Sequence, residues 1–247
     1  MEENVEIAIK NGDMLLQKEK VIDAIREYLK AYEQIKNSED DVTADLCYRL
    51  SQAYNSLESK NDENSKKYAE ISLNIHEKSG AKDLQVLDHL NLGYIEMDAR
   101  KKVESESYFR KAFELSKELD DPFLISTTLN AVAELKSESA KERAEAAGIY
   151  EEVLKISENT EDWENFFEAM RGKIGLTRAS GDEEKALQEA LNAIDLIDKI
   201  SVKIKNKKEK KEFKKSLGFI YDLASDIAME LENVDEAIKI AQRSKAE

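Results

Sequence analysis

The chain has 247 residues, with 38 Lys or Arg and 53 Asp or Glu, so its formal net charge is −15. A surface of this charge repels phosphate groups, which argues against nucleic acid as a partner. Glycine occurs 8 times and proline once, too rarely for the turns of a β-sheet protein. Because 41% of the residues are apolar, a folded core is still expected. These numbers predict an all-α protein.

The sequence also indicates the cellular compartment in which the protein works. Cys47 is the only cysteine, which excludes an internal disulfide and suits a reducing environment. Residues 1–14 lack the positive start and apolar run of a signal peptide. No apolar stretch reaches the roughly 18 residues of a membrane-spanning helix. We therefore expect a cytoplasmic protein without a membrane partner.

Helical patterning, taken in chain order, predicts six pairs of helices. The first helices of the pairs are expected at 3–17, 41–59, 82–99, 122–137, 162–179 and 206–231. The second helices are expected at 20–37, 62–79, 101–119, 140–158, 183–203 and 234–246. Asp182 and Asp235 are good N-caps, and Pro122 suits the first position of a helix. Each pair predicts a helical hairpin of about 40 residues.

The second helix of every pair carries one local pattern, from which the final unit departs most because Lys245 replaces an apolar residue. A small residue is followed four positions later by a small or aromatic residue, and then by a small or apolar pair. The pattern begins at Ala24, Ser65, Ser105, Ala146, Ala186 and Ala237, at intervals of 41, 40, 41, 40 and 51 residues. The expected packing residues of the first helices are Gly12, Ser51, Gly93, Ala133, Gly175 and Ser225.

Such a repeat predicts a stacked array, because one hairpin cannot bury its apolar face alone. We expect a single array over 1–247. Its units are expected near 3–38, 41–80, 82–120, 122–159, 162–203 and 206–247.

This pattern resembles the tetratricopeptide repeat (TPR) family in its long-helix variety. The residues that carry the resemblance best are Leu92-Gly93 with Ser105, Phe109 and Ala112, followed by Ile174-Gly175 with Ala186 and Ala193. HEAT and armadillo repeats have similar periods but lack the order small, aromatic, small, so they are the second choice. The resemblance implies a right-handed α-solenoid of about six TPR-like hairpins.

The resemblance also implies that the first helices line a concave groove that binds a protein or peptide. The expected groove residues are Tyr48, Gln52, Asn55, Asn91, Tyr94, Asn130, Glu134, Lys173 and Asp226. Asn91 and Asn130 recur in a Leu-Asn context and could hold an extended peptide backbone. The alternative is that these polar residues only keep the groove hydrated. The carboxylate clamp of chaperone-binding members does not carry over, because Ile9 and Asp13 occupy its first positions.

No enzyme motif is present, so we expect neither catalysis nor a cofactor or metal. His89 and Cys47 fit inward positions of first helices and are expected in the core, and His76 lacks an obvious ligand partner. Trp163, Phe166 and Phe167 form the densest aromatic cluster. Packing is the simpler interpretation of this cluster, and a partner hot spot is the alternative.

A basic insertion at 199–216 interrupts the repeat. It carries nine lysines and two glutamates, a local charge of +7, which leaves −22 on the rest of the chain. The expected patch comprises Lys203, Lys207, Lys208, Lys210, Lys211 and Lys214. It is interpreted either as a solvated helix face or as a contact for an acidic partner or RNA.

The C-terminal stretch from Phe213 to the run Arg243-Ser244-Lys245-Ala246 resembles the last repeat before the peptidase module of CHAT-domain, caspase-like proteins. This resemblance implies the regulatory or sensor arm of a larger protease, cut at Glu247. The last unit lacks the polar capping helix of a solenoid. We therefore expect a following domain, a partner or a second copy to cover that end.

The sequence thus predicts a non-catalytic scaffold that captures a protein or peptide segment in the concave groove of a TPR array. The regulatory arm of a CHAT-type protease is the alternative. The identity of the partner stays open.

Overall fold

The computed structural model describes residues 2–57 and 62–245, and these residues form thirteen helices without a strand. The helices are α1 Glu2–Leu16, α2 Val21–Ile35, α3 Asp41–Asn55, α4 Asp62–Ser79, α5 Lys82–Asp98, α6 Lys102–Leu119, α7 Pro122–Ser137, α8 Arg143–Thr160, α9 Trp163–Ala179, α10 Glu183–Lys203, α11 Lys207–Ser216, α12 Gly218–Glu230 and α13 Val234–Lys245. The expected helix ends at 59 and 246, and the expected chain end at Glu247, lie outside the described residues.

Local sequence signals place the first ten helices well. Their ends fall within four residues of the predicted ends. The carboxylate of Asp182 accepts a hydrogen bond from the backbone N–H of Lys185 at 3.2 Å and caps α10 as predicted. Asp235 does not cap α13, because Asn233 accepts the hydrogen bond from the N–H of Glu236 instead. Asp235 lies in the first turn, where its charge favours the helix dipole.

The predicted helix 206–231 is wrong as a single element. The chain turns at Leu217 and forms α11 and α12 in its place. Leu217 is almost fully buried, together with Ile220 and Tyr221 of α12, whereas no residue of α11 is fully buried. The turn therefore brings apolar residues into the core that a straight lysine-rich helix would carry into solvent.

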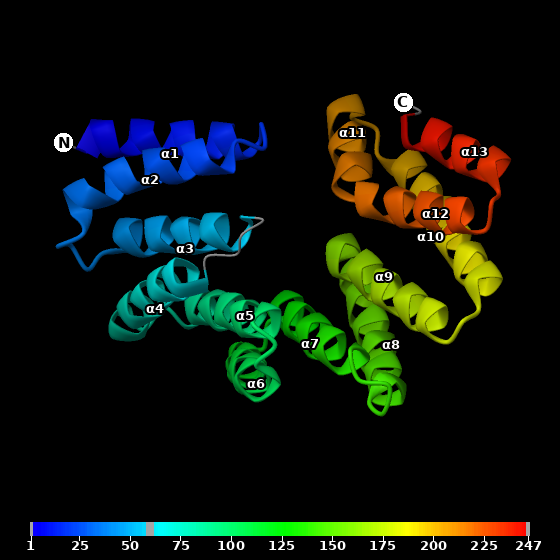
Figure 1. The fold of residues 1–247 in the computed structure, drawn as a ribbon, viewed down its shortest axis with the longest axis horizontal. Coiled ribbons are helices and arrows are strands. Elements are labelled where there is room, and N and C mark those ends of the chain that lie inside the picture. The colour runs from blue at the N-terminus through cyan, green and yellow to red at the C-terminus, as the bar shows by residue number, and fades with distance from the viewer. Residues whose placement is uncertain (1, 58–61, 246–247) are drawn as a thin grey trace. The chain divides into compact units, whose positions relative to one another are not determined.

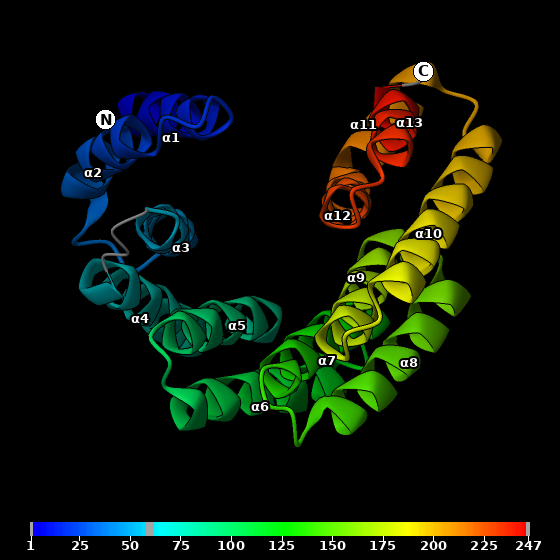
Figure 2. The same cartoon turned by 45° about the vertical axis from the view of Figure 1, so that its right-hand side comes forward.

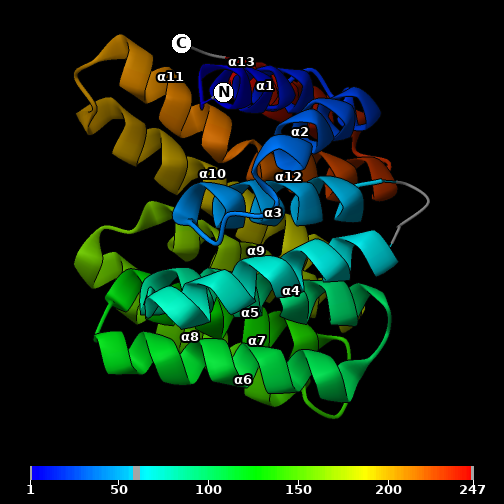
Figure 3. The same ribbon diagram turned by 90° about the vertical axis from the view of Figure 1, so that its left-hand side faces the viewer.

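Contacts between Cα atoms divide the chain into two compact units, unit 1 at 1–128 and unit 2 at 129–247, and the boundary falls inside α7. In unit 1 the helices pack as hairpins, α1 with α2, α3 with α4 and α5 with α6. Figure 1 shows the α1–α2 hairpin lying against α3, and Figure 3 shows α3 to α6 following one another in layers. Unit 1 therefore repeats one packing arrangement.

Aromatic rings fill the space beside two glycines of unit 1. A Cβ atom on Gly12 would lie 2.3 Å from the Tyr28 ring, and one on Gly93 would lie 2.3 Å from the Phe109 ring. Both rings are fully buried. The predicted packing of glycine in a first helix against an aromatic in a second helix is confirmed at these two positions.

Unit 2 uses the same principle with a different glycine. A Cβ atom on Gly172 of α9 would lie 2.1 Å from the ring of Tyr150 on α8, so Gly172 is the packing residue. The prediction of Gly175 for this role is wrong, because Gly175 is exposed and a Cβ there would meet nothing within 4 Å. Figure 2 shows α10 as a long helix that a short loop joins to α11, with α12 and α13 completing the unit.

Left-handed residues end many of the helices. Gly80 and Gly181 have positive φ, and so do five non-glycine residues. The five are Glu19, Arg100, Asp120, Glu161 and Glu232. Side chains with a Cβ atom are strained in this conformation. The five turns can therefore form without glycine, but each costs some stability.

Candidate protein-binding face

Of the two asparagines predicted to hold a peptide backbone, Asn91 has a structural role. Asn91 is only 8% exposed, and its Nδ2 donates to Oγ of Ser51 at 2.8 Å, which ties α5 to α3. An amide that is buried and bonded in this way is not displayed to a ligand. Asn91 is therefore not part of the candidate surface.

The other predicted groove residues of unit 1 lie in different environments. Gln52 is exposed, and the half-buried Asn55 donates to Oδ2 of Asp98 at 3.2 Å. Tyr94 is half-buried, and its ring lies edge-on to Phe109 at 5.1 Å. Tyr48 is half-buried, and its burial, reinforced by the charge of Asp88, raises its pKa. Unit 1 therefore offers few accessible polar groups from this set.

Asp13, at a position of the missing clamp, forms a network instead. Its Oδ1 accepts from the Tyr28 hydroxyl at 2.6 Å and from Nη1 of Arg49 at 2.8 Å. Nε of Arg49 also donates to Asp45 at 2.8 Å. This network links α1, α2 and α3, and it occupies the carboxylate with internal partners.

In unit 2, Asn130 connects two first helices. Its Nδ2 donates to the backbone oxygen of Asn165 at 3.1 Å and to the side-chain oxygen at 3.2 Å. The Nδ2 of Asn165 donates in turn to Asp162, the N-cap of α9, at 2.8 Å. The Oδ1 of Asn130 has no hydrogen-bond partner among the described residues. Asn130 therefore fixes α7 against the start of α9.

Arg171 connects α9 to α12. Its Nε donates to Oε2 of Glu168 at 2.7 Å, and its guanidinium lies 5.9 Å from the centroid of the Phe219 ring. The side chain is 45% exposed and forms no further hydrogen bond with the described residues. The nearby Glu134 carboxylate also interacts with it electrostatically. The terminal Nη groups form no hydrogen bond with the described residues, so they can donate to a ligand.

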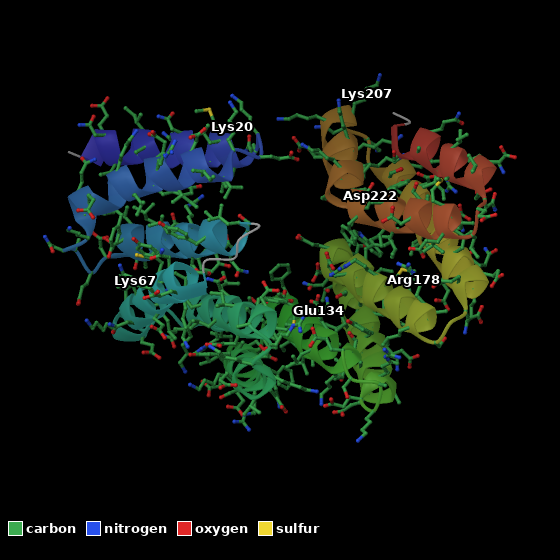
Figure 4. All side chains as sticks on the ribbon, viewed as in Figure 1. Lys20, Lys67, Glu134, Arg178, Lys207 and Asp222 are labelled. Atoms are coloured by element: carbon green, nitrogen blue, oxygen red, sulfur yellow. The ribbon has the colours of Figure 1, made fainter. Side chains whose placement is uncertain are left out.

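A second arginine makes the same connection seven residues later. Arg178 forms ion pairs with Glu230 of α12 and, at 3.1 Å, with Glu183 of α10. Between the two arginines, Gly175 leaves open space on α9. Asp222 and Asp226 lie between Phe219 and Glu230 on α12, and both are exposed. Figure 4 labels Arg178 and Asp222 on these two helices, and Glu134 on α7.

These contacts define a surface that we call the α7–α9–α12 face. Its residues are Asn130, Glu134, Glu168, Arg171, Gly175, Arg178, Phe219, Asp222, Asp226 and Glu230. The predicted residue Lys173 points elsewhere, because its Nζ pairs with Glu151 of α8 at 3.4 Å. Arg171 and Phe219 are not among the groove residues predicted from the sequence. Residues four apart on a helix lie on the same side, so the spacing of Arg171 and Gly175 would have indicated the exposed side of α9.

The aromatic cluster is mainly part of the core. Phe167 is fully buried, and Trp163 and Phe166 are partly buried against the core of unit 2. Their rings contact one another edge to face, at centroid distances of 5.6 and 5.4 Å. These contacts favour the packing interpretation.

The chemically reactive side chains of unit 1 are buried. His76 and Asp88 form a hydrogen bond of 2.6 Å between Nδ1 and Oδ2, a partnership that the sequence analysis did not find. Burial raises the pKa of Asp88 and, through loss of solvation, raises the pKa of the Cys47 thiol to about 12. His89 is 5% exposed. A thiol with such a pKa stays protonated and is a poor nucleophile.

The predicted basic patch is only partly exposed. Lys203, Lys207, Lys208 and Lys211 are exposed, and Lys210 is half-buried. The side chain of Lys214 is only 11% exposed, and its Nζ lies 3.2 Å from Asp198 of α10. Lys214 therefore anchors α11 and is not part of an exposed patch, which corrects the prediction for this residue.

The described residues contain neither a candidate membrane-spanning helix nor a candidate metal-binding group. None of these helices combines the length and the apolar character that crossing a membrane requires. No group of three or more His, Cys, Asp or Glu side chains in that part of the chain is arranged to hold a metal ion.

Known structures match this arrangement of helices. A Rap protein complexed with competence and sporulation factor is 17% identical, with a TM-score of 0.67 over 98% of this chain and 74% of its own. The apo form of RapI is also 17% identical, with a TM-score of 0.65 over 97% of this chain and 96% of its own. These matches show that the chain has the TPR fold. No protein-family model matches the chain, and no curated protein matches its sequence.

A third structure with the TPR fold belongs to a larger protein. It is a signal-transduction ATPase with numerous domains and a tetratricopeptide repeat sensor, from Pyrococcus horikoshii. It is 16% identical, with a TM-score of 0.63, and the match covers 98% of this chain but 35% of the ATPase. The predicted all-α, TPR-like solenoid fold is therefore confirmed, whereas the CHAT-domain resemblance stays a prediction.

Proposed function

We propose that this chain is a non-catalytic protein-binding scaffold, and that its α7–α9–α12 face holds an extended or helical segment of a partner. The observation that carries the proposal is the pair of links from α9 to α12. Arg171 reaches Phe219 and Arg178 reaches Glu230, and Gly175, Asp222 and Asp226 are open to solvent. Three consecutive first helices thus present polar groups in a fixed arrangement.

The face offers complementary chemistry to a polypeptide. The Nη groups of Arg171 can donate to carbonyl or carboxylate oxygens, while the Phe219 ring supplies an apolar contact. Asp222 and Asp226 accept hydrogen bonds from basic side chains or backbone N–H groups. Because internal contacts already hold Arg171 and Asn130, little side-chain order is lost on binding.

One structural neighbour gives further support. The Rap protein of the same fold is complexed with competence and sporulation factor, so that fold is compatible with capture of a factor. A second candidate is the sensor arm of a larger protein. It is favoured by the ATPase whose tetratricopeptide repeat sensor matches nearly the whole of this chain. The protease version of this candidate rests on the C-terminal sequence run alone.

Site-specific photo-crosslinking tests the proposal. Benzoylphenylalanine is placed singly at Gly175 and Asp226 on the face, and at Lys155 and Asn192, exposed residues of second helices, as matched controls. The variants are irradiated in lysate of the source cells. We expect one partner to be captured from both face positions and from neither control position.

Substitutions on the face provide a second test that complements the photo-crosslinking. The double substitution Arg171→Ala with Phe219→Ala removes the contact between these two side chains. We expect it to reduce the amount of partner crosslinked at position 226 about tenfold. Lys173→Ala, on the same helix but paired with Glu151, is the control and should leave capture unchanged. Equal capture from face and control positions would contradict the proposal.

A further inference from the structure

An exposed lysine row runs along α11. Lys207, Lys211 and Lys215 are spaced four residues apart, and all three are exposed. None of them forms an ion pair or a hydrogen bond with another described residue, whereas the neighbouring Lys208 lies 3.8 Å from Glu212. Figure 4 shows Lys207 projecting from the start of α11. We call these three residues the lysine row.

The rest of α11 holds this row in place. Oδ1 of Asn206 accepts from the backbone N–H groups of Lys208 and Glu209 and caps the helix. Phe213 packs against the core, and Lys214 pairs with Asp198 at 3.2 Å. Phe213 and Lys214 therefore anchor α11, while Lys207, Lys211 and Lys215 present positive charge to solvent.

The following helix carries the opposite charge at the same spacing. Asp222, Asp226 and Glu230 of α12 are also four residues apart and exposed. Glu230 pairs with Arg178, but Asp222 and Asp226 form no ion pair or hydrogen bond among the described residues. We call these three residues the acidic row. A four-residue step rises about 6 Å along any α-helix, so the two rows match in pitch.

We propose that this chain associates with a second copy of itself by pairing the lysine row of one copy with the acidic row of the other. Both rows belong to unit 2, and of their six residues only Glu230, which pairs with Arg178, has an ion-pair partner among the described residues. The proposal is favoured over a foreign acidic ligand because the complementary row is already on the chain. It is independent of the proposed function, although an occupied acidic row would block part of the α7–α9–α12 face.

The association is weak and depends on salt. Exposed ion pairs contribute little each, and their attraction is screened as ionic strength rises. Near physiological salt the Debye length is about 8 Å, so charges in contact across the rows still attract while the remaining negative charge of the two copies is largely screened. Val202, 77% exposed beside the lysine-rich segment, adds apolar surface at its edge.

Sedimentation equilibrium over a concentration series tests the proposal. We expect the wild-type chain to self-associate at about 0.1 M salt and to dissociate as salt rises toward 1 M. Lys207→Glu with Lys211→Glu should weaken association about tenfold or more, and so should Asp222→Lys with Asp226→Lys. Circular dichroism and thermal unfolding show that each variant is folded.

Combining the charge reversals makes the test specific. The chain with all four substitutions has the opposite charge at two of the three positions in each row, so we expect its association to return toward that of the wild type. Lys155→Glu with Lys185→Glu, at exposed lysines of α8 and α10, makes the same charge change elsewhere and should leave association intact.

Three results would overturn the proposal. They are a wild-type chain that is monomeric at every concentration and salt, association that the row variants leave unchanged, and a lysine row that binds an oligoglutamate probe without any self-association. None of these results affects the crosslinking at Gly175, so failure of this inference is distinguishable from failure of the proposed function.

Discussion

The ring of Tyr150 on α8 occupies the space that a side chain at Gly172 of α9 would fill. A Cβ atom on Gly172 would lie 2.1 Å from Cζ of Tyr150, far inside contact distance. The ring is buried, and burial raises the pKa of its hydroxyl to about 12. This close approach sets the packing of α8 on α9, and α9 carries the central part of the candidate binding face.

Alanine at two glycines of α9 should therefore have opposite effects. Gly172→Ala forces the Tyr150 ring to move, and we expect a loss of about 1–3 kcal/mol in the free energy of unfolding. Gly175→Ala meets open space in an exposed helical position and should gain up to about 1 kcal/mol from helix propensity. Urea denaturation of both variants measures the difference. Equal losses at the two positions would contradict the packing described for α9.

The left-handed turn residues give a second prediction. Glu19 has a φ of 59° between α1 and α2, a conformation in which glycine is not strained. We expect Glu19→Gly to raise the stability by about 0.5–1 kcal/mol, net of the greater freedom of glycine in the unfolded chain. Lys18→Gly, at the preceding turn residue without positive φ, is the control and should not stabilise. Thermal unfolding of the two variants distinguishes them.

Glu96 gives a prediction about buried charge. It is 1% exposed, and its carboxylate lies 2.5 Å from Nζ of Lys66 and 3.2 Å from Nζ of Lys101. Burial alone would raise its pKa, but the two lysines outweigh burial and the pKa lies below its usual value. Replacing both lysines with methionine leaves the carboxylate buried without a cation, and we expect a loss of about 3–5 kcal/mol.

A rescue variant separates charge from packing at this position. Adding Glu96→Gln to the double methionine variant removes the buried charge and should restore most of the stability. The comparison is a chemical denaturation series of the three variants. No recovery in the triple variant would mean that the loss came from the lysine stems and not from the unpaired carboxylate.

His89 predicts how stability depends on pH. Burial, helped by the charge of Lys111, lowers its pKa to about 4, against an ordinary value near 6.5. Between these values the unfolded chain binds a proton that the folded chain does not, so stability falls as the pH is lowered from about 6.5 to 4. The contribution is at most about 3 kcal/mol.

His89→Gln isolates this contribution from other titrating groups. The variant cannot take up the proton, so its free energy of unfolding should fall less than that of the wild type between pH 7 and pH 5. Urea titrations at the two pH values give both differences. A variant with the same pH dependence as the wild type would show that His89 does not titrate in this way.

Sequence alone predicts most helices because their signals are local. The cap at Asp182 and the proline at the start of α7 each depend on neighbouring residues, and the forty-residue period can be read directly from the sequence. The split at Leu217 was missed because it depends on which residues reach the core of unit 2, a property of the folded chain. Gly172 was missed for the same reason, since its partner Tyr150 lies on the preceding helix and not on the following one.

The candidate face was harder to predict than the fold. Asparagine at 91 and at 130 looks equivalent in sequence, yet Asn91 bonds to the buried Ser51 and Asn130 bonds to Asn165 at a partly exposed position. The repeat pattern marks the packing side of a first helix and leaves its exposed side undefined. Arg171 gains its significance only from the Phe219 ring, 48 residues further along the chain.

Hydrogen exchange of the chain with and without its captured partner tests the central claim most directly. The account predicts added protection in α9 around 168–178 and in α12 around 219–230, with no change in the second helix α10. Arg171→Ala with Phe219→Ala should abolish the added protection while leaving the exchange of the free chain outside these segments unaltered. Protection confined to α10 or to unit 1 would contradict the α7–α9–α12 face as the binding surface.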